Sequence, residues 1–194
     1  MNKKLYIIKK RFWGRIYGMG EWHYFNYFDR PYCKEVINIT NRYMERMKSS
    51  HESGAVVEVG CGTGDIVGNI KWPLKFGFDI NDGNRKVAQK LYPRTIFSNG
   101  SFDEIKCRDL CCLIMVNFIH EIPPEELKDM LTTILEGGVE IVVLDTFKGN
   151  KGTEYTYAHD GNYLLQEKFK LDRRSKGFRT NSGARRYIEW WIRK

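Results

Sequence analysis

The chain alternates between short apolar runs and stretches in which apolar residues recur at helical spacing. The longest run, residues 110–116, is continuously apolar, as a parallel strand covered on both faces requires. Two further strands are predicted near the end of the chain, around a basic loop. Strands are predicted at 56–59, 76–80, 94–97, 110–116, 139–144, 169–172 and 187–192, and helices at 3–17, 31–48, 64–70, 82–91 and 123–135.

The predicted first helix, residues 3–17, carries apolar residues at helical spacing with lysines and arginines around them. These apolar residues are Leu5, Ile8, Phe12 and Ile16. Two arrangements suit such a segment. It can lie in a membrane interface, where basic amphipathic helices bind, or it can be an arm that packs on the rest of the domain. We favour the packed arm.

Residues 56–65 carry the strongest signal for a function. A predicted strand runs straight into Gly60, Gly62 and Gly64, which tolerate positive φ angles and let a ligand lie close to the backbone. A turn of this kind before a helix exposes unpaired N–H groups. Asp79 follows at the end of the next apolar run, where nucleoside-binding α/β folds place the carboxylate that holds the ribose hydroxyls.

The spacing and charge of this turn distinguish between nucleotide cofactors. Dinucleotide-binding turns have the pattern G-x-G-x-x-G, whereas the glycines here are spaced G-x-G-x-G. Glu58 and Asp65 place a carboxylate on each side of the turn, which is unfavourable for a pyrophosphate. A ligand with cationic groups, such as S-adenosylmethionine, suits this environment. A nicotinamide or flavin enzyme and a relative that has lost cofactor binding are the alternatives.

Composition limits the class of protein. A chain of 194 residues, 42% apolar and 29% charged, is expected to form one globular domain. No apolar run approaches the ~20 residues that span a bilayer, and the N-terminal apolar run is too short for a signal-peptide core. We therefore expect a cytoplasmic protein and leave peripheral membrane association open. The five cysteines form no C-x-x-C pair, which argues against a metal site.

The net charge of +8 is concentrated at the two ends of the chain. Residues 1–17 contain six basic side chains and no acids, and residues 168–194 contain ten basic and two acidic side chains. Such ends suit a polyanion, either a nucleic acid such as RNA or an anionic membrane surface. The alternative is that these side chains only solvate edge strands and tails.

The residues VVEVGCGTGD at 56–65, followed by FDIN at 78–81, resemble the first two motifs of class I S-adenosylmethionine-dependent methyltransferases. The resemblance covers residues 54–194 and implies a Rossmann-like α/β fold. That fold has a mostly parallel seven-stranded sheet with an antiparallel last strand and helices on both faces. The implied cofactor is S-adenosylmethionine, with S-adenosylhomocysteine as product. We expect an arm and a helical, aromatic lid at 1–50 and the methyltransferase domain at 51–194.

The resemblance also implies roles at the donor site. Glu58 and Asp65 would orient the methionine ammonium, Asp79 would hold the ribose, Ile80 would pack on the adenine, and Asn117 would lie beneath the methionine portion. The Gly-Asp-Ala that often contacts adenine in the family is absent, so Asn99 or Ser101 would have to substitute. The predicted cofactor-binding residues are Glu58, Gly60, Cys61, Gly62, Gly64, Asp65, Asp79, Ile80, Ser101, Phe102 and Asn117.

Methyl transfer from a sulfonium depends mainly on alignment, and it needs a base only where the acceptor is a hydroxyl. The candidate bases are His120, after the fourth predicted strand, and His159 beside Asp160. The aromatic segment 20–30 would fold over the site as a lid, or would act only as a hydrophobic staple for the first helix. The predicted acceptor-binding residues are Trp22, His23, Tyr24 and Tyr157.

The residues after the fourth predicted strand limit the class of methyl acceptor. Methyltransferases that act on base amino groups usually carry an (Asn/Asp/Ser)-Pro-Pro-aromatic motif there, but residues 117–120 read Asn-Phe-Ile-His. We therefore expect transfer to an oxygen or nitrogen of a small molecule or glycan. The alternatives are an RNA methyltransferase whose basic ends bind phosphates and a non-catalytic, cofactor-binding scaffold subunit. The oligomeric state is left open.

Overall fold

The computed structural model describes most of the chain. Cys107 and the side chain of Trp22 lie outside the described residues. The described residues are 2–24, 27–48, 54–105, 109–148, 156–180 and 183–194.

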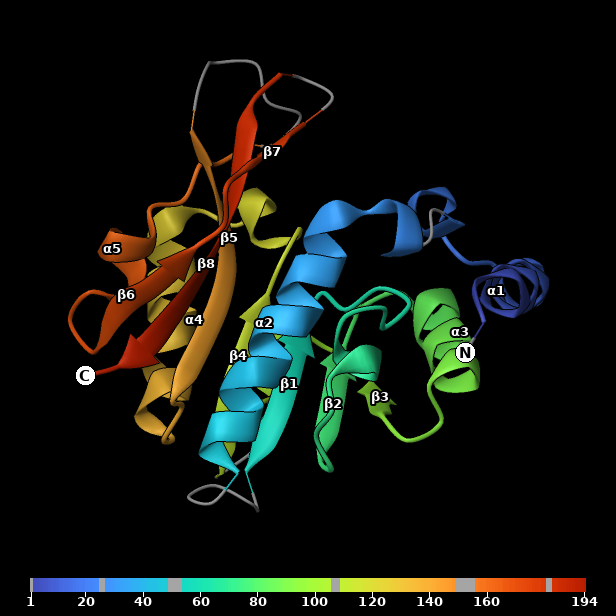
Figure 1. Cartoon of the computed structure of the whole chain (residues 1–194), viewed down its shortest axis with the longest axis horizontal. Coiled ribbons are helices and arrows are strands. Elements are labelled where there is room, and N and C mark those ends of the chain that lie inside the picture. Colours follow the sequence, from blue (N-terminus) through green and yellow to red (C-terminus); the bar gives the residue numbers. More distant parts are fainter. Residues whose placement is uncertain (1, 25–26, 49–53, 106–108, 149–155, 181–182) are drawn as a thin grey trace.

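In the described part of the chain, eight strands form one sheet (Figure 1). Seven follow the order β3-β2-β1-β4-β5-β8-β6, and β7 pairs with β8. The pairs from β3 to β5 are parallel, and β8 is antiparallel to β5 and β6. The strands are β1 (Ala55–Val59), β2 (Lys75–Phe78), β3 (Ile96–Ser98), β4 (Leu110–Met115), β5 (Ile141–Lys148), β6 (Phe169–Arg174), β7 (Phe178–Arg179) and β8 (Arg185–Arg193).

This sheet confirms the predicted fold class, including the antiparallel strand inserted beside β5. Each predicted strand overlaps an observed one. β5 extends past the predicted apolar run because β8 pairs with it as far as Lys148, and the ladder satisfies the backbone of polar residues that the pattern did not assign to a strand.

Helices cover both faces of the sheet. α2 crosses the face turned to the viewer in Figure 1, and α4 lies on the other face. Alternate residues of one strand point to opposite faces, so Val56 packs in the cluster with α2 and Val57 in the cluster with α4. The helices are α1 (Lys3–Tyr17), α2 (Pro31–Met47), α3 (Asp82–Leu91), α4 (Pro124–Glu136) and α5 (Gly161–Leu165).

One local prediction is wrong. The helix predicted at 64–70 is reduced to a 3₁₀ turn, η3 (Val67–Asn69), because Gly64 has a φ of 72° and cannot begin a right-handed helix. The helix predicted at 82–91 is observed as α3, and its N-cap is Asn81. The side chain of Asn81 accepts a hydrogen bond from a first-turn N–H at 2.9 Å.

α1 packs on α3 at the β3 edge of the sheet, at the right of Figure 1. The buried residues of α1 are Tyr6, Lys10 and Gly14. The apolar residues that the pattern singled out face solvent instead, and we call them the outer stripe. They are Leu5, Ile8, Phe12 and Ile16, 47%, 64%, 55% and 53% exposed.

The close packing of α1 on α3 depends on Gly83, where a Cβ would lie 2.5 Å from the carbonyl oxygen of Tyr17. Burial of Lys10 depends on an acidic partner described below. Hydrophobic periodicity indicates neither a close approach at a glycine nor the pairing of a lysine with a distant acid. The contact face of α1 was therefore not predicted. No helix in the described ranges is both long and apolar enough to cross a membrane.

A buried hydrogen bond between α2 and β8 can be tested by substitution. The indole N–H of Trp190, which is fully buried, donates to Thr40 Oγ1 at 3.2 Å. We expect Thr40→Val to lower the free energy of unfolding in urea by about 1–3 kcal/mol, because the indole N–H is left without an acceptor. Thr132→Val on the exposed face of α4 should change it by less than about 0.5 kcal/mol. Equal losses in both variants would contradict the assignment.

Candidate functional site

The glycine turn follows β1 at the carboxyl edge of the sheet. Gly60, Gly62 and Gly64 have φ angles of 66°, 53° and 72°, a region that residues with a Cβ rarely adopt. The neighbouring strand fixes this backbone, since the N–H of Gly62 donates to Asp79 Oδ2 at 2.7 Å. Cys61 is buried within the turn, where a small side chain fits.

Asp79 and Ile80 follow β2, and Asp79 is partly exposed. The two carboxylate oxygens of Asp79 accept from the N–H groups of Gly62 and Asn81, at 2.7 and 2.8 Å. A carboxylate has about four acceptor positions, so Asp79 keeps capacity for hydroxyl donors. Ile80 is 80% exposed. An acceptor beside an exposed apolar surface fits the ribose and the adenine of a nucleoside.

Two rings lie on the glycine turn. A Cβ on Gly60 would overlap the ring of Phe118, and a Cβ on Gly62 would lie 2.6 Å from Cε1 of His23. His23 belongs to η1 (Glu21–Tyr24), the first part of the predicted lid, and burial lowers the pKa of its imidazole. A ligand that approaches these two glycines must therefore take the place of both rings or lie against them.

Glu58 braces the turn from the inside. Its side chain is 3% exposed, and Oε2 accepts from the N–H of Val67 at 2.8 Å. Burial raises the pKa of Glu58 well above its usual value. In the structure Glu58 thus caps η3, and its predicted contact with an ammonium group stays a prediction.

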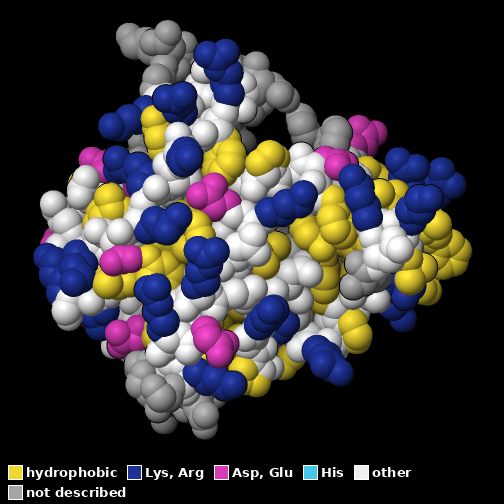
Figure 2. Space-filling model, in the orientation of Figure 1, with side chains coloured by type: hydrophobic (Ala, Val, Ile, Leu, Met, Phe, Trp, Pro, Cys, Tyr) yellow, Lys and Arg dark blue, Asp and Glu magenta, His cyan; other side chains and the backbone are white. Residues whose placement is uncertain are grey.

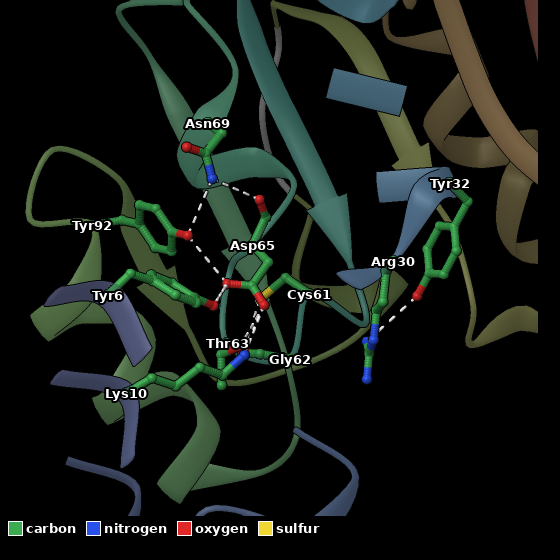
Figure 3. A network of polar contacts seen from close by, with 10 residues as sticks. All are labelled: Tyr6, Lys10, Arg30, Tyr32, Cys61, Gly62, Thr63, Asp65, Asn69 and Tyr92. Carbon is green, nitrogen blue, oxygen red and sulfur yellow. Dashed lines mark hydrogen bonds and ion pairs between the residues drawn. The ribbon is translucent and has the colours of Figure 1, made fainter. Parts of the chain in front are cut away.

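Asp65 is held by the N-terminal arm, as Figure 3 shows. Lys10 Nζ lies 2.8 Å from Oδ2, and the hydroxyls of Tyr6 and Tyr92 both donate to Oδ1. Burial raises the pKa of Tyr6 and Tyr92 far above their usual range, so both stay protonated donors. Asp65 therefore already has a cationic partner within this chain.

A second buried network fixes the residue that follows β4. Asn117 has a φ of 71°, in the left-handed region, although it has a Cβ. Its N–H donates to Asp145 Oδ1 at 3.0 Å, and its side-chain oxygen accepts from Arg186 Nη1 at 3.0 Å. Oδ2 of Asp145 lies 2.7 Å from Arg186 Nε and 3.1 Å from His120 Nε2. Residues from β5, β8 and η5 (Ile119–Glu121) thus hold one strand end in place.

Asp145 is fully buried, yet it is charged in the native state. Burial alone raises the pKa of its carboxyl, but the guanidinium of Arg186 and the ring of His120 outweigh burial and bring the pKa to about 2. The carboxylate is therefore the anionic centre on which both neighbours depend.

The two predicted bases are both buried. His120 is 0% exposed, and its Nδ1 lies 3.3 Å from the carbonyl oxygen of Tyr157. His159 is 4% exposed, donates from Nε2 to the carbonyl of Ile119 at 2.8 Å, and has a pKa lowered by burial. These contacts favour positioning roles for both imidazoles, and their catalytic roles stay predictions.

The remaining predicted residues are dispersed. Phe102 is 2% exposed in the core and lies 5.6 Å from the ring of Phe118, whereas Ser101 is partly exposed. Tyr24 packs on α1 at Gly14, which supports the staple interpretation for that ring. Tyr157 is half-buried and contacts the site through its backbone.

Several residues that build the site carried no sequence signal. These residues are Tyr6, Lys10, Tyr92, Asp145 and Arg186. Each of these residues contacts its partner from a distant segment of the chain. The one available signal was the position of Asp145 directly after a predicted strand, where ligand-binding acids occur in α/β folds.

No protein-family model matches the chain, and no curated protein sequence matches it. Solved structures do match. Magnesium protoporphyrin IX methyltransferase from Synechocystis PCC 6803 with bound S-adenosylhomocysteine is 16% identical over 94% of this chain and 93% of that chain, with a TM-score of 0.66.

Two further matches cover most of both chains. N-methyltransferase NodS from Bradyrhizobium japonicum WM9 is 10% identical over 85% of this chain and 98% of that chain, with a TM-score of 0.59. A TehB-like S-adenosylmethionine-dependent methyltransferase from Corynebacterium glutamicum is 13% identical over 83% and 99%, with a TM-score of 0.54. Because the sequence identities are this low, these structural matches show a shared fold alone.

The buried carboxylate of Asp145 should make the stability of the protein depend on pH. Asp145 has a native pKa of about 2, below its ordinary value of 3.8, so its stabilising effect is present above that value and is lost as the pH falls toward 2. Asp145→Asn should lower the free energy of unfolding at pH 7 by about 3–5 kcal/mol, because Arg186 remains buried without a counter-charge.

The difference between the wild type and this variant should shrink as urea titrations are repeated from pH 5 down to ~2. Asp103→Asn, at an exposed position, is the control and should show little loss at pH 7. A constant difference across this range would reject the charge assignment.

Proposed function

We propose that this chain, which has the Rossmann-like fold of class I S-adenosylmethionine-dependent methyltransferases, is itself a methyltransferase that binds its cofactor at the glycine turn. The observation that carries the proposal is the contact between Gly62 and Asp79. It joins a turn of positive-φ glycines after β1 to a partly exposed acid after β2. When bound, S-adenosylmethionine supplies a methyl group that its sulfonium charge has already activated.

Asp79 would hold the nucleoside through the ribose hydroxyls, using acceptor positions that Gly62 and Asn81 leave open. Ile80, exposed beside it, would cover one face of the adenine. Ser101 lies on the loop after β3, the neighbour of β2, and would contact the adenine edge.

Asn117 would set the position of the methionine portion. Its backbone is held in the left-handed region by Asp145, and its side chain by Arg186, so it does not have to reorganise when a ligand arrives. Rigid alignment of this kind is the main protein contribution to an in-line methyl transfer.

His23 and Phe118 would control access. Both rings lie on the glycines that the ligand approaches, and both come from segments outside the parallel strands. We propose that the η1 segment moves off the turn when the cofactor binds and then covers it, which excludes water from the transfer.

The acceptor is proposed to be an oxygen or nitrogen of a small molecule or glycan. Residues 117–120 lack the Pro-Pro-aromatic motif of enzymes that act on base amino groups. Two of the similar structures are named as a magnesium protoporphyrin IX methyltransferase and an N-methyltransferase. Because His120 and His159 are buried, an acceptor that needs no base, such as an amine or a carboxylate, suits the site better than a hydroxyl.

RNA is the second candidate acceptor, because basic side chains are exposed on the strands at the β6 edge of the sheet. The exposed residues are Lys170, Arg173, Arg174, Arg179 and Arg185. If RNA is the acceptor, its binding constant should fall steeply with salt concentration, with a slope of about −0.7 per phosphate contacted. Absence of RNA binding at low salt would remove this candidate.

The cofactor assignment is tested by calorimetry with S-adenosylhomocysteine. Asp79→Ala should weaken binding at least about ten-fold, because each hydrogen bond to a charged acceptor contributes about 1.5–3 kcal/mol. Asp82→Ala removes an exposed acid three positions along the chain and should leave the affinity within about two-fold. Thermal unfolding of each variant separates lost binding from lost folding.

Unchanged affinity in Asp79→Ala would reject the role of that residue. Failure of the wild type to bind either S-adenosylmethionine or S-adenosylhomocysteine would reject the proposed function. Binding without transfer to any acceptor would favour the scaffold alternative.

A further inference from the structure

The outer stripe is an apolar surface on a helix whose opposite face is already packed. At roughly 100° per residue, its four members fall within about 80° of one another around α1. The buried residues Tyr6, Lys10 and Gly14 lie on the other side of the same helix. α1 is therefore seated on the domain while its most apolar stripe faces away from it.

Basic side chains surround the outer stripe. Lys4, Arg11 and Arg15 lie along one side of it and Lys9 along the other, and all four are exposed. The sequence of α1 contains no acidic residue. Figure 2 shows hydrophobic and basic side chains next to one another at the edge of the molecule where Figure 1 places α1.

We propose that the outer stripe docks this protein on the surface of an anionic lipid bilayer. A helix lying in the interface buries its apolar face at the level of the headgroups, while flanking lysines and arginines contact lipid phosphates. α1 presents both features on the side that the domain leaves uncovered. Its 15 residues are too few to cross the bilayer, and docking keeps the helix parallel to the surface.

The charge pattern favours lipid over a second copy of the chain. A symmetric dimer would bring the same basic side chains of both copies together around a narrow apolar strip. No acid on α1 could offset that repulsion. An anionic bilayer, in contrast, complements every charge that borders the stripe.

The proposal does not depend on methyltransferase activity and is tested with the full chain and lipid vesicles. The wild type should co-sediment with vesicles of phosphatidylcholine and phosphatidylglycerol, and far less with phosphatidylcholine alone. The double variant Ile8→Glu/Phe12→Glu should reduce the partition coefficient more than about ten-fold, because two carboxylates would enter the apolar layer. Both positions are more than half exposed, so the fold should persist, as circular dichroism would verify.

Two controls use the opposite edge of the sheet. Leu171→Glu changes an exposed leucine on β6, which also has basic neighbours, and should leave vesicle binding unchanged. Neutralising Lys9, Arg11 and Arg15 to Gln should weaken binding by roughly five-fold per charge. The same change at Lys170, Arg173 and Arg179 should have a much smaller effect.

Three results would overturn the proposal. The first is a wild type that stays in the supernatant with anionic vesicles. The second is equal binding by the wild type and the Ile8→Glu/Phe12→Glu variant. The third is a wild-type dimer in analytical ultracentrifugation that this variant dissociates, without vesicle binding, which would assign the stripe to a second copy.

Discussion

The carboxylate of Asp145 is the interaction on which the carboxyl edge of the sheet depends. It is fully buried and contacts the backbone after β4, an arginine from β8 and a histidine from η5. Each partner would be a buried charge or an unsatisfied donor without it. The antiparallel insertion of β8 next to β5 brings Arg186 to this position, so the topology of the sheet and the geometry of the site have one common cause.

A second carboxylate ties the first helix to the same edge. Asp65 accepts from two tyrosines and pairs with Lys10, so the conformation of the glycine turn and the seating of α1 are coupled. Glu58, in contrast, accepts from a backbone N–H of η3. Glu58 and Asp65, which look equivalent in the motif, therefore have different partners.

The fold and the backbone of the glycine turn could be predicted from the sequence, because both rest on local pattern. Continuous apolar runs give parallel strands, and three glycines with Asp79 downstream mark one edge. The contact face of α1 could not be predicted, since Lys10 is buried only through an acid that is 55 positions away. The pairing of Arg186 with Asn117, 69 positions apart, is likewise a product of topology.

The burial of Lys10 gives its amine a chemical reactivity unlike that of its neighbours. Its side chain is 2% exposed, whereas Lys4 and Lys9 on the same helix are open to solvent. Amine-selective acylating reagents would therefore label these two and spare the third for as long as the helix stays seated. Covalent labelling of a single position thus becomes a direct readout of whether the first helix has left the glycine turn.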